Sequence, residues 1–231
     1  MFAKHTAILK TGLSLGINWY LTPNEPERKD GKYIEYLNNM PEYERCDPEL
    51  YGFLQAKVSD NKRNVEQIKE LPRFTQVPMY NKILDVGTVR VQERFSVRRE
   101  WFQEGVQVLR ACDIVFMDPD NGIEVKSVPV TDRRSSKYVL YSEIQHLYSC
   151  GKSLIVYNHR DRSTEIDYLK RINCLEDLLG EAQIIVARFN RFSVRDYVFI
   201  LQERHEDTID KTIHRFLDGS WGRLFELKST R

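Results

Sequence analysis

The densest group of polar residues that could do chemistry follows one short apolar run. Residues 114–117 are apolar and partly β-branched, and Asp118-Pro-Asp-Asn-Gly122 comes directly after them. Ligands of open α/β sheets bind at the carboxyl ends of strands, so acids and an amide at this position are placed for chemistry. The proline and the glycine favour a sharp reversal that holds Asp118, Asp120 and Asn121 close to one point. The alternative is an ordinary turn without function, because the same residue types are good turn formers.

A second apolar run ends in the same way. Residues 153–157 are followed by Asn158, His159, Arg160 and, two residues on, Arg162, and a helical stretch at 141–149 separates the two runs. A strand, a crossover helix and a strand form a βαβ unit, which makes the strands parallel and puts both carboxyl ends at one edge. We therefore expect one cleft to hold Asp118, Asp120, Asn121, Asn158 and His159. A carboxylate and an imidazole in a cleft suffice for general acid-base catalysis.

The remaining pattern predicts alternating helices and strands. Asp47 before Pro48 predicts a helix cap, Ser96 predicts the start of a helix reaching Leu109, and residues 164–179 predict a helix ended by Gly180. Strands are predicted at 183–188 and 197–202; their link is too short for a crossover, so they should be antiparallel. A last helix is predicted at 207–217. Together these elements predict one α/β domain over residues 1–231, with a three-layer, Rossmann-like, mostly parallel sheet and an antiparallel edge pair.

Composition gives no global sign of a partner. The formal net charge is +1 at pH 7, so a basic surface for nucleic acid would have to be local. Four cysteines are scattered without a C-x-x-C pair, which favours reduced thiols in a cytosolic protein over a zinc site or a disulfide framework. No signal peptide and no long apolar run are recognisable, so we expect a cytoplasmic protein without a membrane partner.

Two enzyme classes compete for the acidic loop. Asp118, Asp120, Glu124 and Lys126 imitate the acid-x-acid and Glu-x-Lys pattern of metal-dependent nucleases, although that pattern usually places its second half on a separate strand. Glu124 and Lys126 also fit an exposed loop pair. Rossmann-type base methyltransferases are the second class. They carry Asp-Pro-Pro-Tyr or Asn-Pro-Pro-Tyr after a central strand, which is similar to Asp118-Pro-Asp-Asn121, and they end their sheet with an antiparallel pair, as predicted for this chain. Residues 15–26 lack the glycine-rich turn that their cofactor requires.

The two strand-end loops also resemble those of the uracil-DNA glycosylase superfamily. In that α/β superfamily one loop of Asp-Pro or Asn type positions water, and a histidine in a second loop stabilises the departing base. Asp118-Pro119 with Asn121-Gly122 is similar to the first loop, and His159 to the second. The two loops lie closer together in this sequence than in that superfamily.

A wider resemblance covers most of the chain. The motifs that carry it are Asn18-Trp-Tyr-Leu21, Asp30-Gly31, Cys46-Asp-Pro-Glu-Leu50, Phe116-Met-Asp-Pro-Asp-Asn-Gly122, Lys137-Tyr138 with Glu143, and Tyr157-Asn-His159 with Arg162. They resemble a family of bacterial and prophage proteins from phage-defence loci. That resemblance implies a glycosylase that removes glucosylated hydroxymethylcytosine from phage DNA.

Basic residues near the predicted edge are consistent with DNA as the partner. Residues 188–195 interleave Arg188, Arg191 and Arg195 with two phenylalanines, as suits a phosphate track with rings that stack on bases. Arg160 and Arg162 would add positive charge beside His159. The alternative is ordinary hairpin packing with a solvated charged face. Asn18 and Tyr20, after another predicted strand, are candidates to contact a base or to form a pocket wall.

The sequence thus favours a base-excising hydrolase acting on DNA. A flipped nucleotide would enter the cleft, Asp118 or Asp120 would orient water or stabilise the sugar cation, Asn121 would hold the base or the water, and His159 would stabilise the leaving base. Asn158, Arg160, Arg162 and the hairpin arginines would bind substrate. This mechanism requires no metal and no organic cofactor. A methyltransferase-like enzyme, a nuclease and a non-catalytic nucleic-acid-binding adaptor are the alternatives.

Overall fold

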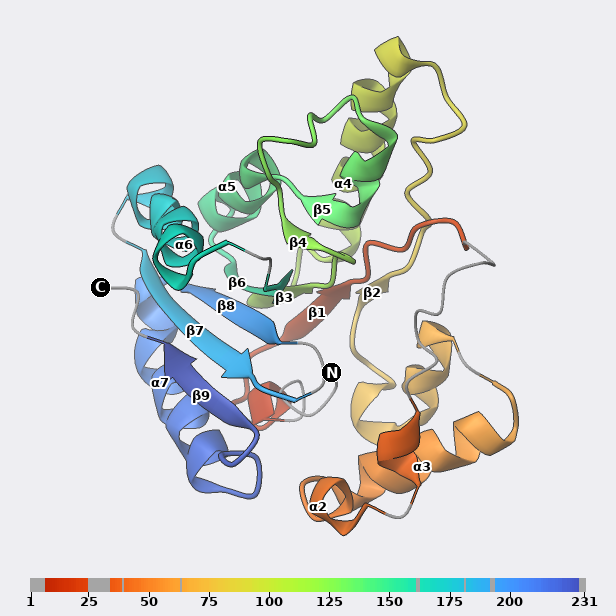
Figure 1. The fold of residues 1–231 in the computed structure, drawn as a ribbon, viewed down its shortest axis with the longest axis vertical. Helices are drawn as coiled ribbons and strands as arrows, with labels where there is room; N and C mark the ends of the chain where they lie inside the picture. Colours follow the sequence, from red (N-terminus) through yellow and green to blue (C-terminus); the bar gives the residue numbers. More distant parts are fainter. Residues whose placement is uncertain are drawn as a thin grey trace.

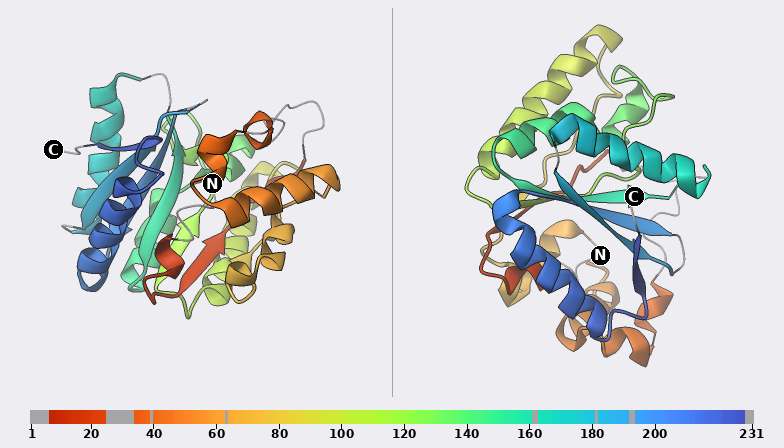
Figure 2. Two further views of the ribbon diagram at one scale, coloured as in Figure 1. Left: turned by 90° about the horizontal axis from the view of Figure 1, so that it is seen from below. Right: turned by 90° about the vertical axis from the view of Figure 1, so that its left-hand side faces the viewer.

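The computed structural model describes residues 7–24, 34–38, 40–62, 64–160, 163–180, 182–191 and 194–228. Helices pack on both faces of a central sheet, as the two views of Figure 2 show. Figure 1 gives the course of the chain through these elements. Within the described ranges no helix is long and apolar enough to cross a membrane.

Seven strands form the central sheet, in the order β2-β1-β3-β6-β8-β7-β9. The first four, β2 (Met79–Tyr80), β1 (Leu15–Asn18), β3 (Ile114–Met117) and β6 (Ser153–His159), are parallel to one another. The other three, β8 (Arg195–Leu201), β7 (Gln183–Phe189) and β9 (Phe225–Lys228), pair antiparallel with their neighbours. The predicted α/β class and the antiparallel pairing of the 183–188 and 197–202 segments are therefore confirmed. The antiparallel part is larger than predicted, because β9 adds a third strand.

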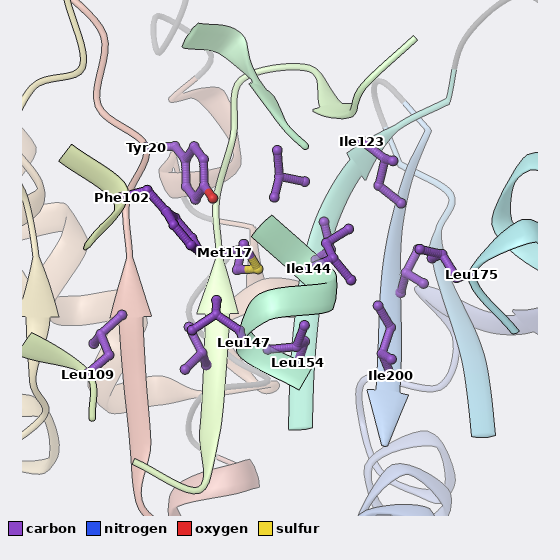
Figure 3. Packing of buried hydrophobic residues seen from close by; sticks show 14 of the residues in the cluster. Tyr20, Phe102, Leu109, Met117, Ile123, Ile144, Leu147, Leu154, Leu175 and Ile200 are labelled. Carbon is purple, nitrogen blue, oxygen red and sulfur yellow. The ribbon is translucent and has the colours of Figure 1, made fainter. Parts of the chain in front are cut away.

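The parallel strands are buried on both faces, which explains their unbroken apolar sequence. Val115 and Met117 pack under α4 (Arg94–Val108), α5 (Tyr141–Ser149) and α6 (Glu165–Leu179), in the core that Figure 3 shows. Ile114 and Phe116 point to the other face, where the core includes residues of α3 (Pro48–Ser59) and α7 (Glu203–Asp218). Alternate side chains of β3 thus enter the two cores.

The helix caps agree with the sequence in two of three cases. Asp47 accepts a hydrogen bond from the amide of Leu50 at the start of α3. Thr164 caps α6, which ends at Gly180 with φ +67°. The third prediction was wrong, because α4 begins two residues before Ser96, whose hydroxyl instead donates to the carbonyl of Glu93. The preceding turn, η4 (Val91–Glu93), leads directly into this helix.

Short elements fill the connections. The segment before β2 contains η1 (Glu35–Leu37), α2 (Pro41–Glu44), η2 (Val65–Glu70) and η3 (Pro72–Phe74). Between β3 and α5 lie β4 (Gly122–Ile123), η5 (Arg133–Lys137) and β5 (Tyr138–Val139), and β4 and β5 form a separate two-stranded parallel sheet. This small sheet was not predictable, because two-residue strands carry no alternation of apolar and polar residues. It folds the chain after Asp118 back over the end of β6.

Candidate functional site

The acidic loop and the histidine lie at the same edge of the sheet. β3 and β6 are adjacent and parallel, with Met117 opposite Val156, so Asp118, directly after β3, and His159, the last residue of β6, lie at the ends of neighbouring strands. The amide of Asp118 donates to the carbonyl of Asn18 at 2.9 Å, and the amide of His159 donates to the carbonyl of Asn121 at 3.3 Å. The predicted βαβ unit and its common edge are confirmed.

Asn158 fixes the loop to the end of β6. Its side-chain oxygen accepts from the amide of Ile123 at 2.8 Å, and its side-chain nitrogen donates to the hydroxyl of Tyr168 at 2.7 Å. Gly122 makes this approach possible: its φ is +105°, and a β-carbon there would lie 1.8 Å from the Asn158 oxygen. The Asn158 side chain is buried and makes both bonds within the protein, and the residue also lines the pocket described next, so its substrate-binding role stays a prediction.

We call these two hydrogen bonds of Asn158, to Ile123 and to Tyr168, the Asn158 lock. A pocket of about 200 Å³ opens beside this lock. Its walls contain three tyrosines together with Glu124, Arg171 and the three predicted residues Asn121, Asn158 and His159. The full lining is Asn121, Ile123, Glu124, Val125, Tyr138, Tyr141, Asn158, His159, Tyr168, Arg171 and Ile172. Asp118 and Asp120 are not among the lining residues. The aromatic walls and the size suit one flat ring rather than a dinucleotide, because larger ligands need cavities of roughly 300 Å³ or more.

The predicted carboxylates Asp118 and Asp120 act instead through their charges on Tyr157, next to the pocket. The hydroxyl of Tyr157 lies 2.9 Å from Nε2 of His159. Burial is the main cause that raises the pKa of Tyr157; the charges of Asp118 and Asp120 raise it further, whereas Arg195 lowers it through its charge and a hydrogen bond. His159 contacts Tyr157 and also lines the pocket, so it connects the two. The edge therefore combines a pocket with a neighbouring charged group formed by Asp118, Asp120, Tyr157, His159 and Arg195.

Glu124 and Lys137 complete the surroundings of the loop. Glu124 accepts from the amide of Tyr141 at 2.6 Å, which places its carboxylate at the start of α5. Nζ of the buried Lys137 lies 3.5 Å from Asp120. In the described part of the chain no three histidine, cysteine or acidic side chains are grouped closely enough to hold a metal ion.

The predicted contacts of Asn18 and Tyr20 with substrate are not supported by their surroundings. Both side chains are buried, and neither lines the pocket. Tyr20 donates to Glu143 at 3.0 Å, and Arg98 makes a bidentate pair with the same carboxylate at 2.7 and 2.8 Å. Burial is the main cause that raises the pKa of Tyr20, and the charge of Glu143 raises it further. This network anchors the segment leading to α5, and the Tyr20 hydroxyl is part of it.

The basic residues fall into different environments. Arg188 is buried and makes a bidentate pair with Asp196 and a third contact with Glu165, so its guanidinium is engaged inside the protein and the predicted phosphate contact would require these bonds to break. Arg160 lies 4.5 Å from the centre of the Tyr168 ring and pairs with Glu165 at 3.2 Å. Arg191 is exposed, and Arg195 adjoins Tyr157. Arg162 lies outside the described residues.

Sequence reasoning missed the tyrosines. Tyr157 and His159 are two apart on a strand and so share a face, a signal that alternation provides. Tyr138, Tyr141 and Tyr168 come from three further elements, and only the fold brings them together. Comparison of the chain with protein-family models and with curated proteins finds no match.

Proposed function

We propose that the chain is a DNA glycosylase that excises a modified base, in defence against phage DNA. The observation that carries the proposal is the junction at the sheet edge, where a ring-sized tyrosine-lined pocket meets the charged group of Asp118, Asp120, Tyr157, His159 and Arg195. An enzyme that works on a base in a duplex must flip it into such a pocket. The pocket supplies surfaces for stacking, and the charged group supplies acid-base chemistry.

In the proposed reaction a flipped base stacks against the tyrosines and Asn121 holds one of its polar edges. Asp118 or Asp120 orients a water molecule or stabilises positive charge on the sugar. The water oxygen forms a bond to the anomeric carbon as the glycosidic C–N bond breaks, and the electron pair of that bond goes to the base. His159 donates a hydrogen bond to the leaving base. The attacking water loses a proton to the carboxylate or to solvent, and the released base takes up one proton, so the products are the free base and the sugar hydroxyl.

The test is base release from DNA. The full chain is incubated with unmodified DNA and with DNA containing glucosylated or unglucosylated hydroxymethylcytosine, followed by alkali treatment and mass analysis of free bases. We expect a free modified base and alkali-sensitive sites, with activity that persists in a chelator. Strand cleavage without a free base, abolished by the chelator, would replace the proposal with a nuclease. Inactivity on every DNA would leave a nucleic-acid-binding adaptor.

A methyltransferase-like enzyme is the second candidate, and the strand order favours it. The antiparallel β8 lies between β6 and β7, and Asp118-Pro119 follows the central strand β3. This order suits a Rossmann-like, three-layer reading of the fold. One observation argues against a methyltransferase. The turn after β1 contains the buried Tyr20, with φ +47°, whereas the cofactor of such enzymes needs a glycine-rich turn at this place. Transfer of labelled methyl groups from S-adenosylmethionine to DNA would establish this alternative.

A further inference from the structure

His159 is held by a neighbouring tyrosine on its own strand. The Tyr157 hydroxyl lies 2.9 Å from Nε2, and the two rings meet edge to face at 87° with their centres 5.3 Å apart. Tyr157 is buried, and its ring also contacts that of Tyr197 at 5.7 Å. The phenol is therefore fixed in place by packing as well as by its polar contacts.

The donors and acceptors around the phenol decide where its hydrogen goes. Arg195, the cross-strand partner of His159, approaches the Tyr157 oxygen with a group that can only donate. Asp118 and Asp120 act on the phenol through their charges. The contact that remains for the hydroxyl hydrogen is Nε2 of His159, and a nitrogen that accepts a hydrogen bond carries no hydrogen itself. The single hydrogen of the neutral ring is then on Nδ1.

We propose that Tyr157 and Arg195 are positioning residues that hold His159 as a neutral imidazole with its hydrogen on Nδ1. In this arrangement Arg195 donates a hydrogen bond to Tyr157, and Tyr157 donates one to His159. The use of this tautomer rests on the proposed function: a neutral imidazole with a fixed N–H donates a hydrogen bond to a departing base without first taking up a proton. Arg195 thereby receives a role different from the phosphate contact that its sequence pattern suggested.

Charges from several elements face this chain of hydrogen bonds. Tyr157 is on β6 and Arg195 on β8, while Asp118 and Asp120 follow β3 and Lys137 pairs with Asp120. Arg160 follows His159 directly. The carboxylates favour a protonated imidazole, whereas Arg195 and the hydrogen bond from Tyr157 favour a neutral one. Removing the phenol hydroxyl should shift this balance toward the protonated ring.

The experiment is a pH titration of the His159 ring nitrogens by NMR in the full chain labelled with ¹⁵N histidine. The parent should show the Nδ1–H tautomer. Tyr157→Phe should raise the titration midpoint of His159 by about 0.5 to 1 pH unit, as expected for loss of one hydrogen bond of ordinary strength. Tyr148→Phe is the matched control, because it removes another hydroxyl hydrogen bond, to the carbonyl of Leu201 at 3.2 Å, and should leave the midpoint unchanged.

A second pair of variants tests the arginine. Arg195→Lys keeps a charged donor and should keep the midpoint near that of the parent, whereas Arg195→Gln removes the charge and should raise it. The proposal is overturned by an Nε2–H tautomer in the parent, or by a Tyr157→Phe midpoint equal to that of the parent in a folded protein. A thermal melt of each variant establishes that it is folded.

This outcome is separable from that of the proposed function. The NMR result requires no turnover, so the expected tautomer in a chain that releases no base from any DNA would support the positioning role and contradict the glycosylase. Base release by a chain whose His159 carries its hydrogen on Nε2 would do the reverse. Where both hold, Tyr157→Phe should move the pH profile of base release in step with the His159 midpoint.

Discussion

At the scale of single residues, the candidate site consists of a few side chains at one edge of the sheet, and its two acids differ in their surroundings. Asp118 follows β3 directly, and its carboxylate is close enough to raise the pKa of Tyr157 by charge. The charge of Asp120 also raises the pKa of Tyr157, and this residue is exposed, with its carboxylate 3.5 Å from Nζ of Lys137. The two acids are therefore not equivalent: Asp118 is half-buried at the strand end, and Asp120 reaches the solvent.

This difference makes Asp118 the first acid to test. Asp118→Asn keeps the shape of the side chain and removes its charge, so base release should fall by roughly two to four orders of magnitude, the range expected of a positioned acid-base group. Binding of the same DNA should be retained. Base release and DNA binding are measured on one preparation whose thermal melt matches that of the parent. A folded variant that excises at the parental rate would remove Asp118 from the mechanism, and Asp120→Asn would then be the variant that should lose activity.

At the scale of elements, the loop is positioned by a lock that spans β4, β6 and α6. Asn158 bonds the amide of Ile123 on one side and the hydroxyl of Tyr168 on the other. Nothing larger than a hydrogen fits at Gly122, because its missing β-carbon would overlap the Asn158 oxygen. The lock explains why a two-residue strand stays in place beside the pocket.

Gly122→Ala tests the lock, and Gly180→Ala is its matched control. Both glycines have positive φ, +105° and +67°, but only Gly122 has a neighbour in the way of a β-carbon. We expect Gly180→Ala to lower the free energy of unfolding by about 1 kcal/mol from backbone strain alone. Gly122→Ala should cost about 3 kcal/mol, because Asn158 must also give up buried hydrogen bonds. Equal losses in urea unfolding of the two variants would contradict the lock.

The hairpin of β7 and β8 contains a buried ion pair where the sequence suggested a binding surface. Arg188 contacts Asp196 at 2.7 and 2.8 Å, and Asp196 has no exposed surface. The contacts with Asp196 and Glu165 raise the pKa of Arg188, so the guanidinium stays charged. Its role is to balance the Asp196 carboxylate inside the protein.

Arg188→Met should therefore destabilise the fold rather than only weaken DNA binding. Removing one partner of a buried pair leaves an uncompensated charge, which costs about 3 to 5 kcal/mol. The double variant Arg188→Met with Asp196→Leu should recover most of that loss in urea unfolding. Arg191→Ala, in the exposed link of the hairpin, should leave stability unchanged. A stable Arg188→Met single variant would return this arginine to the candidate phosphate contacts.

These elements also show what the sequence could and could not predict. The βαβ unit was predictable because β3, α5 and β6 follow one another with clear apolar runs and a glycine stop. The partner of Arg188 was not, because Asp196 lies on the other strand of the hairpin and a charge pattern does not reveal burial. The tyrosine pocket was missed for the same reason, since its walls come from segments that meet only in the folded chain.

At the scale of the whole molecule, the two faces of the sheet are closed by different means. One face packs under α4, α5 and α6, and the other is covered by elements that include α3 and α7. The start of α7 is tied to the amino end of β6 through His205, whose Nδ1 lies 2.9 Å from the Ser153 hydroxyl. Arg204 donates to Nε2 at 3.1 Å, so the ring is neutral and its hydrogen is on Nδ1.

This arrangement makes the stability of the fold depend on pH. Burial, and next the charge of Arg204, lower the pKa of His205 below its usual 6.5, while Asp113 opposes them. Because the unfolded chain binds the proton more readily, the contribution of His205 is full above about pH 6.5 and is lost as the pH falls from there toward the lowered value. The melting temperature of the parent should therefore decline in that window, and that of His205→Gln should stay flatter.

His214→Gln is the matched control, because it removes an exposed histidine from the same helix and should keep the decline of the parent. At more acidic pH all three proteins should lose stability together. Asp113 and Glu165 have pKa values held below their usual 3.8 and 4.5, the first mainly by hydrogen bonds from Ser14 and the second by Arg188 and Arg160 against the effect of burial. Their contributions are lost as the pH falls below those usual values. An identical decline in the parent and in His205→Gln between pH 7 and 5 would show that this histidine does not couple folding to pH.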